Sequence, residues 1–165
     1  MDRQQVEQAL AKNGPRILHL AFSYLHNRED SEDVLQETMI RYFQSAPPFE
    51  DDEHEKAWLL RVAANLSKNI LRSLAHKSEE LPEELPAEGI PEDSIALYQA
   101  VSALPEKYRE VVHLFYYEDM TTAQIAAILQ KRESSVRSLL HRARALLRSD
   151  LGEDIDTERG RAKIG

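Results

Sequence analysis

Cationic and hydroxyl side chains gather in one stretch near the end of the chain, from Met120 to Arg148, where six basic residues stand with one acidic residue. Guanidinium groups can hydrogen-bond phosphates or guanine edges, and serine hydroxyls can reach either acceptor. The candidates for such contacts open a predicted helix or lie off its apolar stripe, and they are Ser134, Ser135, Arg137, Ser138, His141 and Arg142. This stretch therefore predicts contacts with nucleic acid.

Two helical patterns separated by a short polar break would position these side chains. Thr121 can cap a short helix that carries apolar Ile125 and Leu129. The longer helix that follows repeats apolar residues every three or four positions, at Val136, Leu139, Leu140, Ala143 and Leu147. Such a pair, with a basic outer face on its second helix, is the helix-turn-helix geometry that places a recognition helix in a major groove. The pattern alone leaves open a solvated cationic face on a structural hairpin.

A second basic segment, from Lys56 to Ser78, contains five basic residues and no acidic residue. Acidic residues collect instead at 29–37, 50–55 and 79–93, and the net charge is −8. This net charge argues against a protein that binds DNA tightly without a partner, because nonspecific affinity for DNA comes from neutralising its phosphates. Alternating acidic and basic blocks suit two kinds of partner.

The apolar periodicity predicts an all-α fold made of two small helical domains. Apolar residues repeat at helical spacing from residue 16 to 43, with a break at 27–30, and again from 58 to 74, which predicts an N-terminal helical bundle. Prolines and glutamates then indicate a flexible acidic linker. We place the N-terminal domain at 1–75, the linker at 76–92, the helix-turn-helix domain at 93–150 and a fraying polar tail at 151–165.

Several classes of chemistry find no support in the residues. The chain has no Cys, its six His are scattered without a metal-ligand spacing, and no Gly-rich phosphate loop occurs. We therefore expect no metal, no cofactor and no enzymatic activity. The N-terminus lacks an apolar signal-peptide core, and no apolar run reaches the length of about 18 residues that a membrane span needs. A cytoplasmic protein without membrane insertion is the expectation.

Two pairs of stretches resemble the extracytoplasmic-function group of bacterial sigma factors. The family's second region resembles EDSEDVLQETMIRYFQ followed by KAWLLRVAANLSKNILRS, and its fourth region resembles ALPEKYREVVHLFYYEDMTTAQIAAIL followed by SSVRSLLHRARALLR. Together these stretches cover about residues 16–148 in the expected order, with an acidic linker between them. The resemblance implies a factor that binds core RNA polymerase and directs promoter-specific transcription initiation. It also implies control by an anti-sigma protein.

The resemblance further implies roles for particular residues. In the second region, Asp33, Gln36 and Glu37 match the positions that dock on a coiled coil of the polymerase's largest subunit, and acids one helical turn apart form one anionic face. The loop and helix after this region match the part that captures unstacked bases of the minus-10 element. Its candidates are Phe49, Arg61, Asn65, Lys68, Asn69 and Arg72. Trp58, at helical spacing with Val62, is expected in the core rather than as a base-stacking platform.

In the fourth region, residues 133–142 match the part that reads the minus-35 element as duplex DNA. The chain departs from the family there, because the turn lacks the Gly often found near Gln130, and Ser134-Ser135 replaces a frequent Gly-Thr. In the second region, Ala64 replaces a frequent basic residue and Asn69 a frequent Asp.

Two other classes of protein compete with this interpretation. A stand-alone helix-turn-helix regulator, with the N-terminal bundle as a sensor or dimerisation module, explains the C-terminal half equally well. It leaves the acidic docking run and the acid-free helix unexplained, and it would bind an operator tightly without polymerase. An enzyme would need a ligand or acid–base spacing that the acids and histidines lack. A sigma factor with two modest basic patches is expected to bind DNA weakly alone, since polymerase docking raises the effective concentration of each patch.

Overall fold

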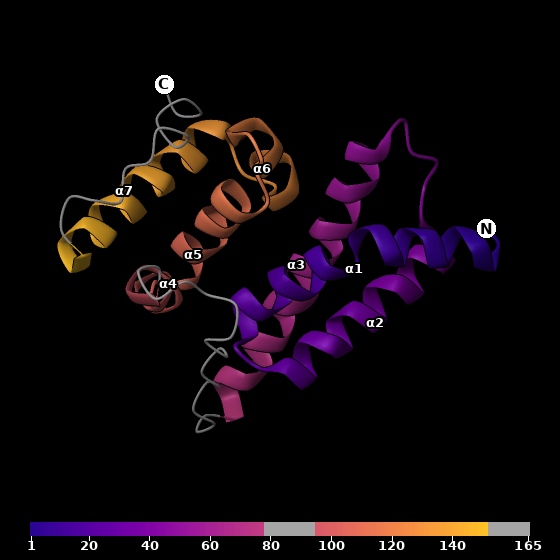
Figure 1. The fold of residues 1–165 in the computed structure, drawn as a ribbon, viewed down its shortest axis with the longest axis horizontal. Helices are drawn as coiled ribbons and strands as arrows, with labels where there is room; N and C mark the ends of the chain where they lie inside the picture. The colour runs from indigo at the N-terminus through magenta and orange to yellow at the C-terminus, as the bar shows by residue number, and fades with distance from the viewer. Residues whose placement is uncertain (78–94, 152–165) are drawn as a thin grey trace. The chain divides into compact units, whose positions relative to one another are not determined.

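The computed structural model describes residues 1–77 and 95–151, and the regular elements within these ranges are all helical, as predicted. The chain divides into two compact units, Met1–Glu84 and Leu85–Gly165, which are described separately. We call their described parts unit 1 and unit 2; Figure 1 shows the helices of each. The predicted linker at 76–92 and the tail at 151–165 lie almost entirely outside the described residues.

Unit 1 is a bundle of three helices: α1 (Arg3–Leu25), α2 (Arg28–Ser45) and α3 (Asp52–Lys77), each of which contacts the other two. The apolar repeat predicts a helix that starts at residue 16, whereas helix α1 begins at Arg3. The reason is a capping box, in which the Asp2 carboxylate accepts from the Gln5 backbone N–H and the Gln5 side chain accepts from the Asp2 N–H. Pro15 lies inside this helix.

The break between α1 and α2 falls where the sequence predicts it. His26 ends α1 in the left-handed conformation, at φ 50°, and Asn27 caps α2 by accepting from the Asp30 N–H at 2.8 Å. Pro47 and Pro48 follow the end of α2, and α3 begins at Asp52 with three acids in its first turn. Acids at a helix N-terminus interact favourably with the helix dipole.

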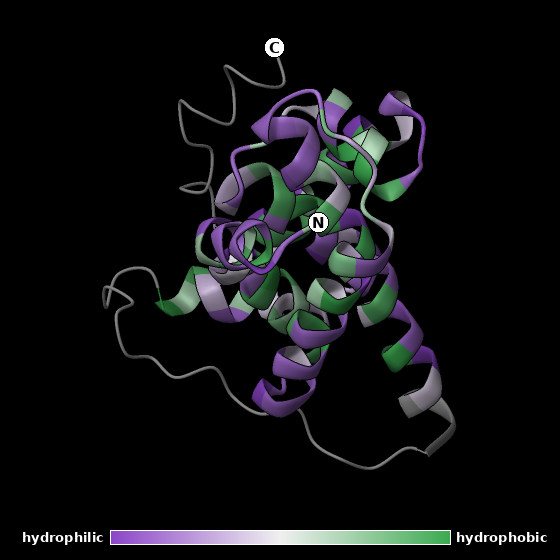
Figure 2. Cartoon of the chain, turned by 90° about the vertical axis from the view of Figure 1, so that its right-hand side faces the viewer, coloured by the Kyte–Doolittle hydropathy of each residue, from purple (hydrophilic) through white to green (hydrophobic). Residues whose placement is uncertain are grey.

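Apolar side chains from all three helices fill the core of unit 1. The fully buried residues include Ile17, Leu20, Ala21, Val34, Leu59, Leu60 and Ala63. Polar residues share this interior, since Asn13, Ser31, Thr38 and Ser67 are also buried. The coloured ribbon in Figure 2 shows hydrophobic and hydrophilic residues alternating along the helices, as amphipathic packing requires.

Unit 2 contains α4 (Ile95–Ser102), α5 (Glu106–Val112), a π-helical segment η2 (His113–Tyr117), α6 (Thr122–Leu129) and α7 (Glu133–Leu151). Helices α4, α5 and α6 all pack on α7. One core cluster consists of Val101, Leu104, Val112, Ala143 and Leu147. The segment η2 continues a buried run that begins in α5, since Glu110, Val111 and Val112 are buried as well as His113, Leu114 and Phe115.

Candidate functional site

A tight turn connects α6 to α7. Helix α6 begins with a capping box, in which the Thr121 hydroxyl accepts from the Gln124 N–H at 3.1 Å and the Gln124 side chain accepts from the Thr121 N–H at 2.9 Å. It ends with Gln130 in the left-handed conformation, at φ 56°, and the Lys131 N–H closes the turn on the Ala126 carbonyl at 3.0 Å. Gln130 therefore adopts the conformation for which glycine is favoured at a helix end.

Helix α7 separates an apolar side from a polar side, as predicted. Four of the five predicted stripe residues are buried, namely Val136, Leu140, Ala143 and Leu147, and Leu139 is half-buried. The candidate nucleic-acid contacts are all exposed, namely Ser134, Ser135, Arg137, Ser138, His141 and Arg142. They occupy the first three turns of α7, so the structure brings the whole set together on one helix. A helix of this width can enter the major groove of DNA.

A second polar face runs along α3. Asn65, Asn69 and Arg72 are exposed, whereas Arg61 and Lys68 are half-buried. These five residues follow one another along the chain at intervals of four, three, one and three positions. This spacing keeps all five on one side of the helix. Arg72 Nη1 donates to Asn69 Oδ1 at 3.5 Å. The face offers cations and amides along a single line, which suits a nucleic-acid strand.

Phe49, the sixth residue of the predicted minus-10 set, lies apart from that face in an aromatic cluster. Its ring stacks on Tyr42, with centroids 6.1 Å apart and planes at 7°, and it meets His54 and Trp58 edge-on. Trp58 packs on Tyr42, with centroids 6.2 Å apart, but it is half-buried at the edge of the core rather than within it. The cluster of Tyr42, Phe49, His54 and Trp58 thus anchors the loop between α2 and α3.

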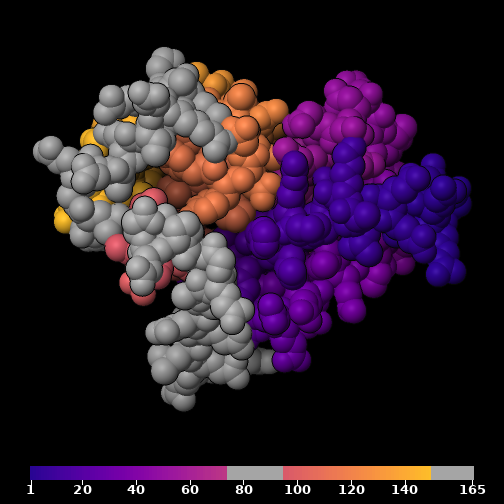
Figure 3. Space-filling view, in the orientation of Figure 1, coloured from indigo at the N-terminus to yellow at the C-terminus, as the bar shows by residue number. Residues whose placement is uncertain are grey.

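Polar contacts tie the same loop region to the other helices. Glu55 in the first turn of α3 accepts from the Tyr42 hydroxyl of α2 at 2.9 Å and from the Asn13 amide of α1 at 3.5 Å. Burial, together with the Glu55 carboxylate, raises the pKa of Tyr42 to about 12. Sequence reasoning missed Glu55 and Asn13, since apolar periodicity carries no signal for contacts between distant polar residues. The loop and the start of α3 stand at the surface of unit 1, in magenta in Figure 3.

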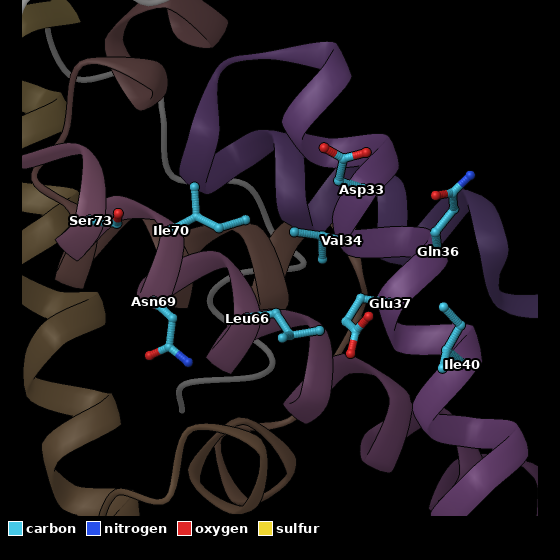
Figure 4. A pocket seen from close by; sticks show the side chains of 9 residues that line it. All are labelled: Asp33, Val34, Gln36, Glu37, Ile40, Leu66, Asn69, Ile70 and Ser73. Carbon is cyan, nitrogen blue, oxygen red and sulfur yellow. The ribbon is translucent and has the colours of Figure 1, made fainter. Parts of the chain in front are cut away.

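A groove of about 480 Å³ lies between α2 and α3 and brings together residues of two predicted sites. It is lined by Asp33, Val34, Gln36, Glu37, Ile40, Leu66, Asn69, Ile70 and Ser73. All three predicted docking residues are among them, and so is Asn69 of the α3 face. In Figure 4, Ile70 and Leu66 of α3 point toward α2, while the acids stand along the α2 side. The groove therefore has an apolar floor and an acidic rim.

The acidic helix α2 also exposes apolar side chains beside the groove. Ile40 and Phe43 leave 47% and 57% of their surfaces exposed, and they follow Asp33, Gln36 and Glu37 at helical spacing. Glu37 forms an ion pair with Arg41, at 3.3 Å. Exposed apolar residues next to acids indicate a protein interface more than a nucleic-acid interface.

The part of the chain that the structure describes, 1–77 and 95–151, holds no group of three or more His, Asp or Glu placed to bind a metal ion. No helix in these ranges is both long and apolar enough to cross a bilayer.

Comparison with known protein families gives two matches, one in each unit. The family model described as "Sigma-70 region 2" matches residues 10–77, and the one described as "Sigma-70, region 4" matches residues 94–147. The first match contains the α2–α3 groove and the polar face of α3. The second contains the helix-turn-helix of α6 and α7.

Curated relatives agree with these matches. The RNA polymerase sigma-E factor of Streptomyces coelicolor is 35% identical over 160 residues, covering 92% of this chain and 89% of that protein. The ECF RNA polymerase sigma factor SigW of Bacillus subtilis is 27% identical, covering 82% of this chain and 83% of its own. The ECF RNA polymerase sigma factor SigE of Mycolicibacterium smegmatis is 31% identical over 159 residues, and the match spans 62% of that longer relative.

Solved structures share the fold. The sigma factor RpoE of Bartonella quintana, solved with the anti-sigma factor NepR, matches 92% of this chain and 99% of its own, with a TM-score of 0.78 and 23% identity. CnrH, solved with the cytosolic domain of CnrY, matches 93% of this chain and 91% of its own, with a TM-score of 0.70 and 24% identity.

Proposed function

This chain belongs to the extracytoplasmic-function group of the sigma-70 family, and we propose that it binds core RNA polymerase through an acidic groove and directs it to promoters through basic faces on α3 and α7. The observation that carries the proposal is the separation of charge: acids line the α2 side of the groove, while cations lie along α3 and on the outside of α7. Members of this family catalyse no covalent step themselves, since the polymerase performs the chemistry. We place the protein in the cytoplasm with its polymerase.

The α2–α3 groove is the proposed docking site for polymerase. Asp33 and Glu37 provide negative charge, Gln36 provides an amide, and Leu66 with Ile70 provides an apolar floor. A basic amphipathic helical pair, such as the coiled coil that the family binds, complements both properties. Exposed Ile40 extends the apolar contact along α2.

The polar face of α3 is the proposed path for the single-stranded minus-10 element. Arg61, Lys68 and Arg72 would contact phosphates, and the Asn65 and Asn69 amides can pair with base edges. Phe49 is packed against Tyr42 and Trp58, so we assign it to shaping the loop that borders this path. The acidic first turn of α3 then marks the end of the path, because it repels phosphates.

The outer face of α7 is the proposed reader of the minus-35 duplex. Arg137 and Arg142 can bond guanine edges or phosphates, while Ser138 and His141 lie between them on the same face. Ser134 and Ser135 at the first turn can donate to phosphates near the helix N-terminus, which itself favours anions.

We also propose that an anti-sigma protein controls this factor. The support is that RpoE and CnrH, which share this fold, were solved as complexes with NepR and with the cytosolic domain of CnrY. A protein that covered the α2–α3 groove would compete with polymerase for Asp33 and Glu37. The same protein would also cover Asn69, which lines the groove and belongs to the polar face of α3.

The test is run-off transcription from a genomic fragment library by core polymerase with and without this protein. Discrete new start sites that need both components support the proposal. Tight, sequence-specific binding by the protein alone, without new start sites, would instead identify a stand-alone regulator. Alanine at Asp33, Gln36 and Glu37 together is expected to weaken polymerase binding about tenfold. The matched control, Glu32→Ala, removes an exposed acid of the same helix outside the groove.

A further inference from the structure

Glu133 is the single acidic residue between Met120 and Arg148, and it is the first residue of α7. An acid in this place is unfavourable for binding DNA, because it lies beside candidate contacts to a polyanion. An acid at a helix N-terminus helps the helix dipole, yet that gain is available from neutral caps as well. The contacts of Glu133 indicate a more specific role.

One oxygen of Glu133 joins two helices. Its Oε1 accepts from the Thr122 hydroxyl of α6 at 2.7 Å and from Arg137 Nη2, one turn further along α7, at 2.8 Å. Thr122 is 6% exposed, whereas the side chain of Arg137 is 57% exposed. The carboxylate therefore connects a buried hydroxyl on the supporting helix to an exposed guanidinium on the recognition helix.

This arrangement restrains the orientation of the Arg137 side chain more than it stabilises the fold. An exposed ion pair contributes little to folding, since solvent screens it and both side chains lose freedom. The Thr122 hydroxyl restrains the carboxylate, and a restrained carboxylate selects among the many rotamers of Arg137. A guanidinium held in one orientation can meet both acceptors of a guanine, whereas a freely moving one contacts any nearby phosphate.

We propose that Glu133 is a positioning residue that aims Arg137 at one base pair of the minus-35 element and restrains it from nonspecific phosphate contacts. The inference rests on the proposed role of α7 in reading duplex DNA. It has a distinctive consequence: loss of Glu133 raises nonspecific DNA affinity, because a negative charge is removed and Arg137 is released, while selectivity at one base pair falls. Damage to the fold would lower both.

The experiment uses the full chain and duplexes randomised over the minus-35 element, in two arms. One arm measures transcription with core polymerase, and the other measures selection of duplexes by the protein alone. Arg137→Ala identifies the base pair that Arg137 reads. Glu133→Ala is expected to lose about tenfold preference at that base pair, the order that one bidentate contact supplies, with the other positions unchanged. Binding of Glu133→Ala to a duplex of unrelated sequence is expected to tighten severalfold at low salt.

Two further variants separate the contacts of Glu133. Thr122→Val removes the donor on α6 while leaving the ion pair, and it should reduce preference at the same base pair by a smaller factor. Glu106→Ala is the matched control, since Glu106 is likewise the first residue of its helix, α5, and its loss should leave the base preferences unchanged.

Uniform loss of preference at every position in Glu133→Ala, or unchanged affinity for unrelated DNA, would overturn the inference. Thermal unfolding of each variant distinguishes positioning from loss of fold. If the wild-type protein produced no polymerase-dependent transcripts, the proposed sigma function would fail, while the arm without polymerase would still decide the role of Glu133.

Discussion

The two units build their candidate surfaces in different ways. In unit 2, the residues proposed to read DNA lie on α7 alone, and the opposite side of the same helix is buried. In unit 1, the proposed docking groove is formed by both α2 and α3, and the loop beside the α3 face is held by contacts that reach α1. A surface on one amphipathic helix follows from the helical period. A surface that several helices share depends also on long-range polar contacts.

The largest change in stability is expected from a substitution on the buried side of α7, because that side supports the exposed surface of the same helix. Leu140 is fully buried on α7, so Leu140→Ala should lower the free energy of unfolding by about 3 kcal/mol through lost burial and a cavity. Duplex binding should fall with it. Leu146→Ala is the control on the same helix, because Leu146 is 42% exposed, and it should change stability by less than about 0.5 kcal/mol. Equal losses in denaturant titrations of the two variants would contradict this account of α7.

The shared surface of unit 1 should respond to the loss of one polar contact. Tyr42→Phe removes the hydroxyl that Glu55 accepts from, and this should destabilise unit 1 by about 1–2 kcal/mol. Trp58 is the single Trp of the chain and contacts Tyr42, so its fluorescence should report the change in the loop. Tyr98→Phe in unit 2 is the control. A Trp58 spectrum that Tyr42→Phe leaves unaltered would mean that the Glu55 contact does not hold the loop.

The ionisation of one tyrosine in each unit, Tyr42 and Tyr98, allows the pH dependence of stability to be compared between the units. Burial raises the pKa of Tyr42 to about 12 with help from Glu55, and burial raises the pKa of Tyr98 to about 12 against the opposing Ser102 hydrogen bond. Unfolded tyrosine titrates near pH 10, so the folded chain keeps these protons more tightly. The resulting stability is fully present below pH 10 and is lost as pH rises toward 12. At pH 11 each tyrosine should account for a loss of about 1 kcal/mol.

Absorbance of tyrosinate against pH checks this prediction. Glu55→Gln should lower the pKa of Tyr42 and leave that of Tyr98 where it is, because only Tyr42 has the carboxylate as a partner. Equal movement of both tyrosines in Glu55→Gln would show that the substitution acts through general unfolding instead.

The sequence predicted most of unit 2 and less of unit 1, for a physical reason. The stripe of α7, the cap at Thr121 and the exposed face from Ser134 to Arg142 all follow from local spacing. The break at Asn27 was also predicted from local signals. The early start of α1 depended on a capping box that the apolar repeat does not contain.

Contacts between residues far apart in the sequence were beyond prediction. Asn13 and Glu55 are polar residues 42 positions apart, and nothing in the period of either helix pairs them. The resemblance predicts Phe49 as a DNA contact, and its packing on Tyr42 and Trp58 depends on how the loop folds back between α2 and α3. The roles of the proposed site residues stay predictions until the polymerase and DNA experiments are done.

The smallest change in stability is expected from substitutions at the helix ends, where one helix of each unit can be compared. Gln130 after α6 and His26 after α1 both hold left-handed backbone, which is strained for residues other than glycine. Gln130→Gly should stabilise unit 2 by about 0.5 kcal/mol, since relief of the strain exceeds the added freedom of the unfolded chain. His26→Gly should gain less, because His26 stacks on Phe22, with centroids 6.2 Å apart, and the substitution removes that contact. Denaturant midpoints measured for both variants decide the matter: an equal gain at the two positions would mean that the His26 ring contributes nothing, and both helix ends would then be explained by backbone conformation alone.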